Sequence, residues 1–179
     1  LFALLAAIGA QISFPMWTFG VPKTLQTLVV ILAALHLGPR WGMASMLLYL
    51  LVGALGAPLF SKGESGLAVI LGQTGGYLIG FVLCQPVIAW CVKQPDGSPR
   101  GWGGIVLGSL LGHAVVFAIG VPWLYLVRKL DQSPEINSIT WSAAFFGGFV
   151  VFLPGTFLKT LIAVVIARAS LPWAMKKIW

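Results

Sequence analysis

One charged side chain lies inside a long apolar run, where a charge is costly. Between positions 136 and 167 the sole charged residue is Lys159, five residues after Pro154. A lysine at mid-depth in a bilayer costs on the order of 2.5–3.5 kcal/mol. A proline in a first turn marks a helix start, and helix starts carry partial positive charge. Two interpretations remain open: Lys159 snorkels to the outer surface, or it faces inward and binds a carboxylate or a urea carbonyl.

Other chemistry-bearing patterns are missing from the sequence. It contains no GxxxxGK[ST] phosphate loop, no GxSxG elbow, no HExxH helix and no TVGYG filter. Its four acidic residues fall in expected loops, which leaves no membrane-embedded carboxylate for a proton relay. Neither His36 nor His113 has a second metal-binding residue at helical spacing. Cys84 and Cys91 are interpreted as packing residues. We therefore expect no metal site, no cofactor and no catalysis.

Charged residues are scarce and mostly separate long apolar runs. Of the 179 residues, 59% are hydrophobic and 8% are charged, against about 25% charged in soluble domains. One membrane-spanning helix needs roughly 17–25 apolar residues. The sequence therefore predicts an all-α membrane protein, a single domain over 1–179 formed by a bundle of six transmembrane helices. The net charge of +7 is spread singly or in pairs, which suits membrane topology and not nucleic acid.

Glycine, proline and charged residues mark the boundaries of these helices. The expected helices lie at about 1–13, 24–37, 41–56, 72–92 and 102–127. The last segment is discontinuous: a short helix or partly inserted loop at about 138–151 precedes the sixth helix, which starts with Pro154 in its first turn.

Rows of small residues predict where helices approach closely. Glycines recur every four residues in two expected helices, at Gly72, Gly76 and Gly80 and at Gly104, Gly108 and Gly112. A similar face in the first helix contains Ala3, Ala7 and Ala10, with Ala6 beside them. The residues alone leave open whether this alanine face packs inside the protein or against another subunit.

The distribution of lysine and arginine predicts the orientation in the membrane. With a cytoplasmic N-terminus, six of these residues lie inside and four outside: Arg40, Lys93, Arg100, Arg168, Lys176 and Lys177 against Lys23, Lys62, Arg128 and Lys129. This majority predicts a multi-pass protein of the cytoplasmic (inner) membrane with both termini in the cytoplasm. The loops around 14–23, 57–70 and 128–152 then face the outer side.

Four ordered stretches resemble one family, the BioY proteins, which are the biotin-binding S components of energy-coupling-factor (ECF) vitamin transporters. They are VPKTLQTL at 21–28, LGPRWG at 37–42, LGQTGGYLIGF at 71–81 and LPGTFLK at 153–159. The resemblance implies biotin capture from the outer side, with the loops after helices 1, 3 and 5 closing the pocket. It also implies two kinds of partner, a membrane T component and two cytoplasmic ATPases, and it favours Ala3, Ala7 and Ala10 as contacts with the T component.

The same resemblance assigns Lys159 and Thr156 to the polar end of biotin. The family usually has PGDxxK, and this chain has Thr156 in place of the aspartate. A threonine cannot supply a negative charge to Lys159, so we hypothesise that Glu64, in the loop after the third helix, supplies the missing carboxylate. A second departure is Gln73 where the family usually has the proline of LGPTGGY, which adds an amide near the pocket.

Further ligand contacts are expected from Gln26 and Tyr77, although ordinary helix packing would explain either residue equally well. Apolar walls for the ring sulfur and valeryl chain are expected from four aromatic side chains: Phe14, Trp17, Phe60 and Phe145. Two other functions stay open. The substitution at Thr156 allows an S component or facilitator for a different vitamin, and a membrane enzyme or scaffold is a further alternative.

Overall fold

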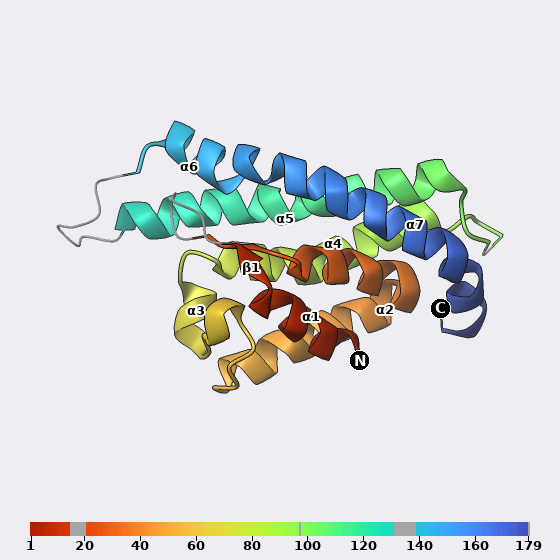
Figure 1. Ribbon diagram of the computed structural model, residues 1–179, viewed down its shortest axis with the longest axis horizontal. Coiled ribbons are helices and arrows are strands. Elements are labelled where there is room, and N and C mark those ends of the chain that lie inside the picture. The colour runs from red at the N-terminus through yellow and green to blue at the C-terminus, as the bar shows by residue number, and fades with distance from the viewer. Residues whose placement is uncertain (15–20, 97, 131–138, 179) are drawn as a thin grey trace.

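Helices account for most of the chain in the computed structural model, which describes residues 1–14, 21–96, 98–130 and 139–178. Within these residues, four helical segments are long and apolar enough to cross a membrane: Gln26–Ala54, Gly75–Val92, Trp102–Leu130 and Trp141–Lys177. The helices lie side by side along the long axis of the molecule (Figure 1). The expected class of helical membrane protein is therefore confirmed. The small antiparallel ladder of β1 (Ser13–Phe14) and β2 (Lys23–Thr24) was not expected.

The expected helices at 24–37 and 41–56 are the two arms of one element, α2 (Gln26–Ala54). Between the arms, Gly38 has φ 71° and ψ −173° and is followed by Pro39, a conformation that glycine adopts without steric cost. A Cβ on Gly42 would lie 3.6 Å from the Cα of Ala34, whereas eight residues of straight helix span about 12 Å. The chain therefore reverses at Gly38, and the two arms pack against each other.

The two glycine rows meet at the interface between α4 (Gly75–Val92) and α5 (Trp102–Leu130). A Cβ on Gly80 would lie 2.8 Å from the Cα of Val116, and one on Gly108 would lie 3.1 Å from the carbonyl oxygen of Ile88. The predicted close packing of these helices is thus confirmed. Gly72 precedes α4, and its carbonyl oxygen accepts a 2.9 Å hydrogen bond from the indole of Trp123.

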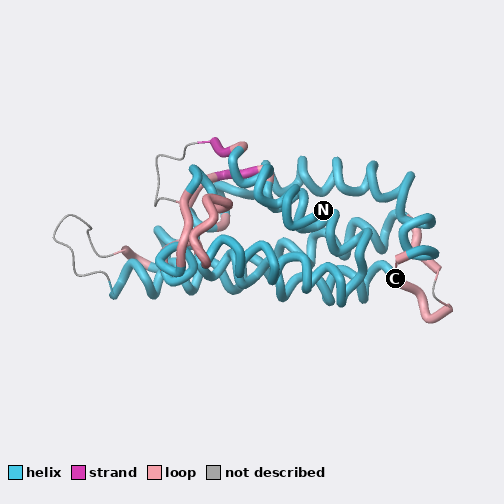
Figure 2. The backbone as a smooth tube through the Cα atoms, turned by 90° about the horizontal axis from the view of Figure 1, so that it is seen from below, coloured by secondary structure: helices cyan, strands magenta, loops and turns pink. Residues whose placement is uncertain are grey.

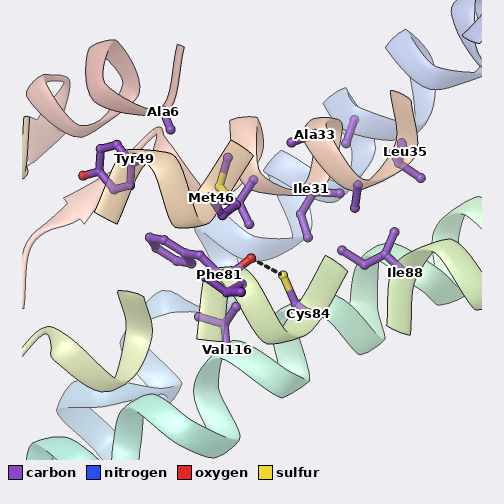
Figure 3. Close-up of a cluster of buried hydrophobic side chains, with 14 of the residues drawn as sticks. Ala6, Ile31, Ala33, Leu35, Met46, Tyr49, Phe81, Cys84, Ile88 and Val116 are labelled. Atoms are coloured by element: carbon purple, nitrogen blue, oxygen red, sulfur yellow. Dashed lines mark hydrogen bonds between the residues drawn. The ribbon is translucent and has the colours of Figure 1, made fainter. Parts of the chain in front are cut away.

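The apolar core is built where α4 packs against α2 and α5. Figure 3 shows Ile31 and Met46 from the two arms of α2 facing Phe81 and Ile88 of α4. Cys84, also in this core, donates its thiol hydrogen to the carbonyl oxygen of Phe81. Cys84 and Cys91 are buried and form no disulfide with each other, consistent with the packing role expected for them.

The short helix α1 (Phe2–Gln11) packs its small residues inward. Ala7 and Ala10 are buried and Ala3 is partly buried, whereas Leu4 and Ile8 are more than half exposed. Ala7 and Ala10 are therefore covered within this chain, and contact of Ala3, Ala7 and Ala10 with another subunit stays a prediction. The large side chains that α1 exposes are those of Leu4 and Ile8.

The last segment begins with α6 (Trp141–Gly148), followed by the 3-10 turn η2 (Val150–Phe152) and by α7 (Leu153–Lys177). The Thr140 side chain caps α6 by accepting a hydrogen bond from the Ala143 N–H at 3.2 Å. Pro154 lies in the first turn of α7, as expected. Farther along, His36 joins α2 to α7 through a 2.6 Å hydrogen bond between its Nε2 and the Ser170 hydroxyl, in line with a structural role.

The connections cluster at the two ends of the helices. One end carries β1, β2, the 3-10 turn η1 (Ser61–Gly63) and the short helix α3 (Leu67–Leu71), and the other carries the loop between α4 and α5 (Figure 2). The end of α5 and the start of α6 lie at the first of these ends as well (Figure 1). The described parts of the three loops expected to share a side therefore lie together, and we call this the ladder end.

Candidate functional site

A cavity opens at the ladder end between the helices. The space between its lining residues amounts to about 820 Å³, part of which is open solvent. Its lining comes from β2, the first arm of α2, the 60–64 segment, α3, α4, α5, η2 and α7. The described lining residues are Val21, Pro22, Thr24, Gln26, Thr27, Phe60, Ser61, Lys62, Glu64, Val69, Thr74, Tyr77, Leu78, Phe81, Val116, Phe117, Phe152, Thr156 and Lys159.

Lys159 faces this cavity from the second turn of α7. Its ammonium group donates a 2.8 Å hydrogen bond to the hydroxyl of Thr27 in α2. Thr156, three residues earlier, lies on the same face of the helix and is buried, whereas Phe157 and Leu158 are exposed. The side chain of Lys159 therefore faces inward, toward the cavity, and its binding of a ligand stays a prediction.

The charges around the cavity are mostly positive. Lys62 and Lys159 line it together with a single acid, Glu64, among the described residues. Just outside, the ammonium group of Lys23 lies 5.9 Å from the ring centre of Phe152, a cation–π distance. The charges of Lys23 and Lys159 are close enough to repel each other. This arrangement favours a ligand that carries a carboxylate or another electron-rich oxygen.

Gln26 and Tyr77, both predicted to contact a ligand, differ in whether their polar groups are already hydrogen-bonded within the protein. The Gln26 amide nitrogen is buried and has no hydrogen-bond partner among the described residues. Leaving such a group unpaired costs about 1–3 kcal/mol, which a ligand oxygen would recover. The Tyr77 hydroxyl instead donates a 2.9 Å hydrogen bond to the carbonyl oxygen of Gly148. Tyr77 therefore offers its ring to the cavity and not its hydroxyl.

Glu64 and Gln73 are the two residues that the sequence analysis named because this chain departs from the BioY pattern. Glu64 is exposed and lines the cavity. In the described part of the chain its carboxylate forms no ion pair with Lys159, which donates a hydrogen bond to Thr27 instead. Gln73 lies just before α4 and does not line the cavity, whereas the next residue, Thr74, does.

Aromatic rings form the apolar walls, although mostly not the rings that we expected. Phe60 lines the cavity as predicted, joined by three rings that the sequence did not single out: Phe81, Phe117 and Phe152. Phe14 and Phe145 do not line it and are 60% and 41% exposed. Trp17 lies outside the described residues. The edge-on contact of Phe117 with Tyr77, at 6.3 Å between ring centres, makes one wall continuous.

Phe60 is held in place by α1 and by the second arm of α2. The side-chain amide of Gln11 donates a 2.9 Å hydrogen bond to the Phe60 carbonyl oxygen, and the Tyr49 hydroxyl donates to the Leu59 carbonyl oxygen at 3.2 Å. The Phe60 ring fits against Gly53, where a Cβ would overlap it. This side of the cavity is thus set by contacts that do not involve a ligand.

Sequence reasoning missed Thr27, the hydrogen-bond partner of Lys159, and four other polar residues that line the cavity: Thr24, Ser61, Lys62 and Thr74. The one available signal for Thr27 was its place in the 21–28 stretch, next to Gln26, which was predicted to contact the ligand. No such signal marked Phe117 or Phe152, because both lie in uniformly apolar segments.

Comparisons with known proteins all lead to one group. The model of the BioY family matches residues 1–176. A protein of Pyrococcus horikoshii named "Probable biotin transporter BioY" is 38% identical over 94% of this chain and 90% of its own length. The biotin transporter BioY2 of Lactococcus lactis is 35% identical over 94% of this chain and 87% of its own. A crystal structure of the S-component for biotin from an ECF-type ABC transporter superposes with a TM-score of 0.80, at 27% identity, over 94% of this chain and 85% of that chain.

Proposed function

The chain belongs to the BioY family, and we propose from this membership and from its cavity that it captures biotin for uptake, as the substrate-specific subunit of an ECF-type ABC transporter. It binds the vitamin from the outer side and performs no chemistry on it. The observation that carries this proposal is the cavity at the ladder end, where Lys159 and Gln26 face a space walled by aromatic rings, in a fold like that of a biotin S-component.

The chemistry of biotin suits this lining. Its valerate carboxylate and ureido carbonyl are acceptors for the ammonium group of Lys159 and for the unpaired amide of Gln26. Its ring sulfur and alkyl chain are apolar and fit against Phe60, Phe117 and Phe152. Thr156 and Glu64 supply acceptors for the ureido N–H groups. Gln73 and Tyr77 contribute indirectly: Gln73 positions the start of α4, and Tyr77 positions the aromatic wall.

The membrane arrangement that we infer has six spans. They are α1, the two arms of α2, α4, α5 and the discontinuous pair of α6 and α7. The ten helical residues of α1 are about 15 Å long and reach only part of the way across a hydrocarbon core of about 30 Å. The ladder end faces outward and both termini face the cytoplasm, because the end that contains the α4–α5 loop carries more lysine and arginine. An impermeant maleimide tests this in intact cells: Lys62→Cys should be labelled and Lys177→Cys should not. The reverse pattern would invert the topology, and the buried Cys84 and Cys91 give little background.

The energy for uptake comes from partners, because the chain has no phosphate loop. A membrane T component and two ATPases fill this role. The exposed Leu4 and Ile8 of α1 provide an apolar surface for the T component, with Ala3 at its edge and Ala7 and Ala10 supporting it from behind. Co-expression with a T component and its ATPases should give a complex that co-purifies. Leu4→Glu should release the chain from that complex without changing biotin binding.

One observation favours a second ligand class. Thr156 stands where the family has aspartate, so an S component for a different vitamin is the competing function. Equilibrium binding of labelled biotin to the purified protein decides between them, with unlabelled biotin, thiamine and riboflavin as competitors. Displacement by biotin alone supports the proposal. Binding of another vitamin with no biotin signal would overturn it, and absence of binding by any vitamin would favour the scaffold alternative.

A further inference from the structure

A second cavity lies at the end of the helices opposite the ladder end. It encloses about 1,450 Å³, much of it open to solvent, between the α2 reversal, the end of α4 and the α4–α5 loop. Three exposed cations line it, Arg40, Lys93 and Arg100. They come from three separate segments of the chain, so the fold concentrates them in one place.

No acidic residue among the described residues lines this second cavity. The nearest carboxylate in the sequence, Asp96 in the same loop, accepts hydrogen bonds from the Ser98 hydroxyl at 2.7 Å and from the Ser98 N–H at 2.9 Å. These bonds lower the pKa of Asp96, so its carboxylate stays ionised, and its hydrogen bonds go to Ser98 within the same loop. Arg40 and Arg100 have no ion-pair partner in the described part of the chain. Arg40 and Arg100 therefore bring two positive charges to the cavity that no carboxylate of the described residues pairs with.

Two large aromatic side chains stand beside these cations. Trp41 and Trp90 both line the second cavity, with exposed fractions of 64% and 78%. Exposed tryptophan at the ends of membrane helices is typical of the level of the lipid headgroups. Two further exposed tryptophans, Trp102 at the start of α5 and Trp173 near the end of α7, lie at this end too. Arg168 stacks over Trp102 at 5.6 Å.

From this combination we propose that the second cavity binds the headgroup of an anionic phospholipid, with the phosphate between Arg40 and Arg100 and the glycerol and upper acyl chains against Trp41 and Trp90. Guanidinium groups bind phosphate oxygens through paired hydrogen bonds, and basic pockets between membrane helices are suited to anionic headgroups. A lipid fits better than an acidic protein surface, because the tryptophans place the cations at headgroup depth.

The test uses the purified full chain in neutral detergent, titrated with dioctanoyl phosphatidylglycerol or with dioctanoyl phosphatidylcholine. Native mass spectrometry counts the bound lipid. Phosphatidylglycerol should be retained in preference, with one molecule dominating. The paired variant Arg40→Gln/Arg100→Gln should weaken its binding about fivefold for each charge removed. The control Lys176→Gln/Lys177→Gln removes the same charge at the same end but outside the cavity, and it should bind like the parent.

Further measurements distinguish a lipid from a free phosphate ester and from an acidic protein partner. Glycerol phosphate at the same concentration should compete poorly, because it lacks acyl chains, and competition equal to that of phosphatidylglycerol would overturn the lipid assignment. Equal retention of both lipids, or unchanged phosphatidylglycerol binding in the paired arginine variant, would overturn the site itself. Loss of T-component co-purification in that variant with normal lipid binding would identify an acidic protein partner instead. Biotin binding by each variant reports that it is folded.

Discussion

The ammonium group of Lys159 in α7 donates a 2.8 Å hydrogen bond to the hydroxyl of Thr27 in α2. This contact joins two residues that are 132 positions apart in the sequence. It holds a membrane-embedded cation at the cavity, where its remaining donors can reach a ligand. The protein thus satisfies only part of the hydrogen-bonding capacity of the Lys159 ammonium group, and a ligand oxygen could accept a further hydrogen bond from it.

Replacing Lys159 by alanine should weaken biotin binding strongly. A hydrogen bond to a charged group contributes about 1.5–3 kcal/mol, which corresponds to roughly a 10- to 150-fold rise in Kd. Isothermal titration of the purified variant measures this. The matched control is Lys129→Ala, which removes one charge from the last turn of α5 at the same end without touching the cavity. Equal affinity of Lys159→Ala and the parent would remove Lys159 from the site.

Thr27→Val removes the partner of Lys159 while keeping the side-chain shape. We expect a rise in Kd of about three- to tenfold, because a typical hydrogen bond contributes about 0.5–1.5 kcal/mol. Thr27→Ser keeps the hydroxyl and should restore most of the affinity. In a double-mutant cycle with Lys159→Ala the two losses should be less than additive. Full additivity would mean that Thr27 does not act through Lys159.

Thr156→Asp supplies the carboxylate that the BioY pattern has at this position. It would lie three residues before Lys159 on the same helical face and accept N–H bonds from the ureido ring. We expect biotin to bind about five- to tenfold tighter, since hydrogen bonds to charged groups are the stronger ones. Thr156→Val, of similar size but without a hydroxyl, should bind several-fold more weakly. Weaker binding by the aspartate variant than by the valine variant would contradict this orientation.

Glu64→Gln tests whether the exposed acid at the cavity stands in for the missing carboxylate. Because Glu64 is exposed, its contribution is at most about 1 kcal/mol, so Kd should rise no more than about fivefold. The difference should shrink at high salt, where exposed charges are screened. Asp96→Asn removes an acid at the opposite end and serves as control. Identical affinities of Glu64→Gln and the parent across a salt series would end this hypothesis.

The α4–α5 interface makes a prediction about stability. At Gly80 an added Cβ would lie 2.8 Å from the Cα of Val116, a backbone atom that cannot move alone. Gly80→Ala should lower the free energy of unfolding by about 1–3 kcal/mol. Gly103→Ala, in the same pair of helices but facing open space, should raise it by about 0.5–1 kcal/mol. Thermal unfolding in detergent compares the two, and equal shifts would contradict the packing.

Local patterns in the sequence located the long helices to within a few residues of their ends, but not the short helix α3 or the β1–β2 ladder. The glycine and proline at Gly38 and Pro39 marked the reversal within α2, because backbone geometry allows few residues there. Rows of glycine marked the α4–α5 interface. Lys159 stood out because a charge inside an apolar run has few explanations. Each of these features depends on residues close together in the chain, whose physical consequences do not require knowledge of neighbours.

Which side chains face the cavity was decided by the rotation and tilt of whole helices. Which phenylalanines face the cavity depends on how α5 and η2 turn toward α4, so Phe117 and Phe152 could not be told from Phe14 and Phe145 by type or spacing. Small residues of α1 lie against α2, where a Cβ on Gly9 would come within 3.1 Å of the Cα of Gln26. The partner of Lys159 lay at the other end of the sequence, and only tertiary packing brings Thr27 within hydrogen-bonding distance of it.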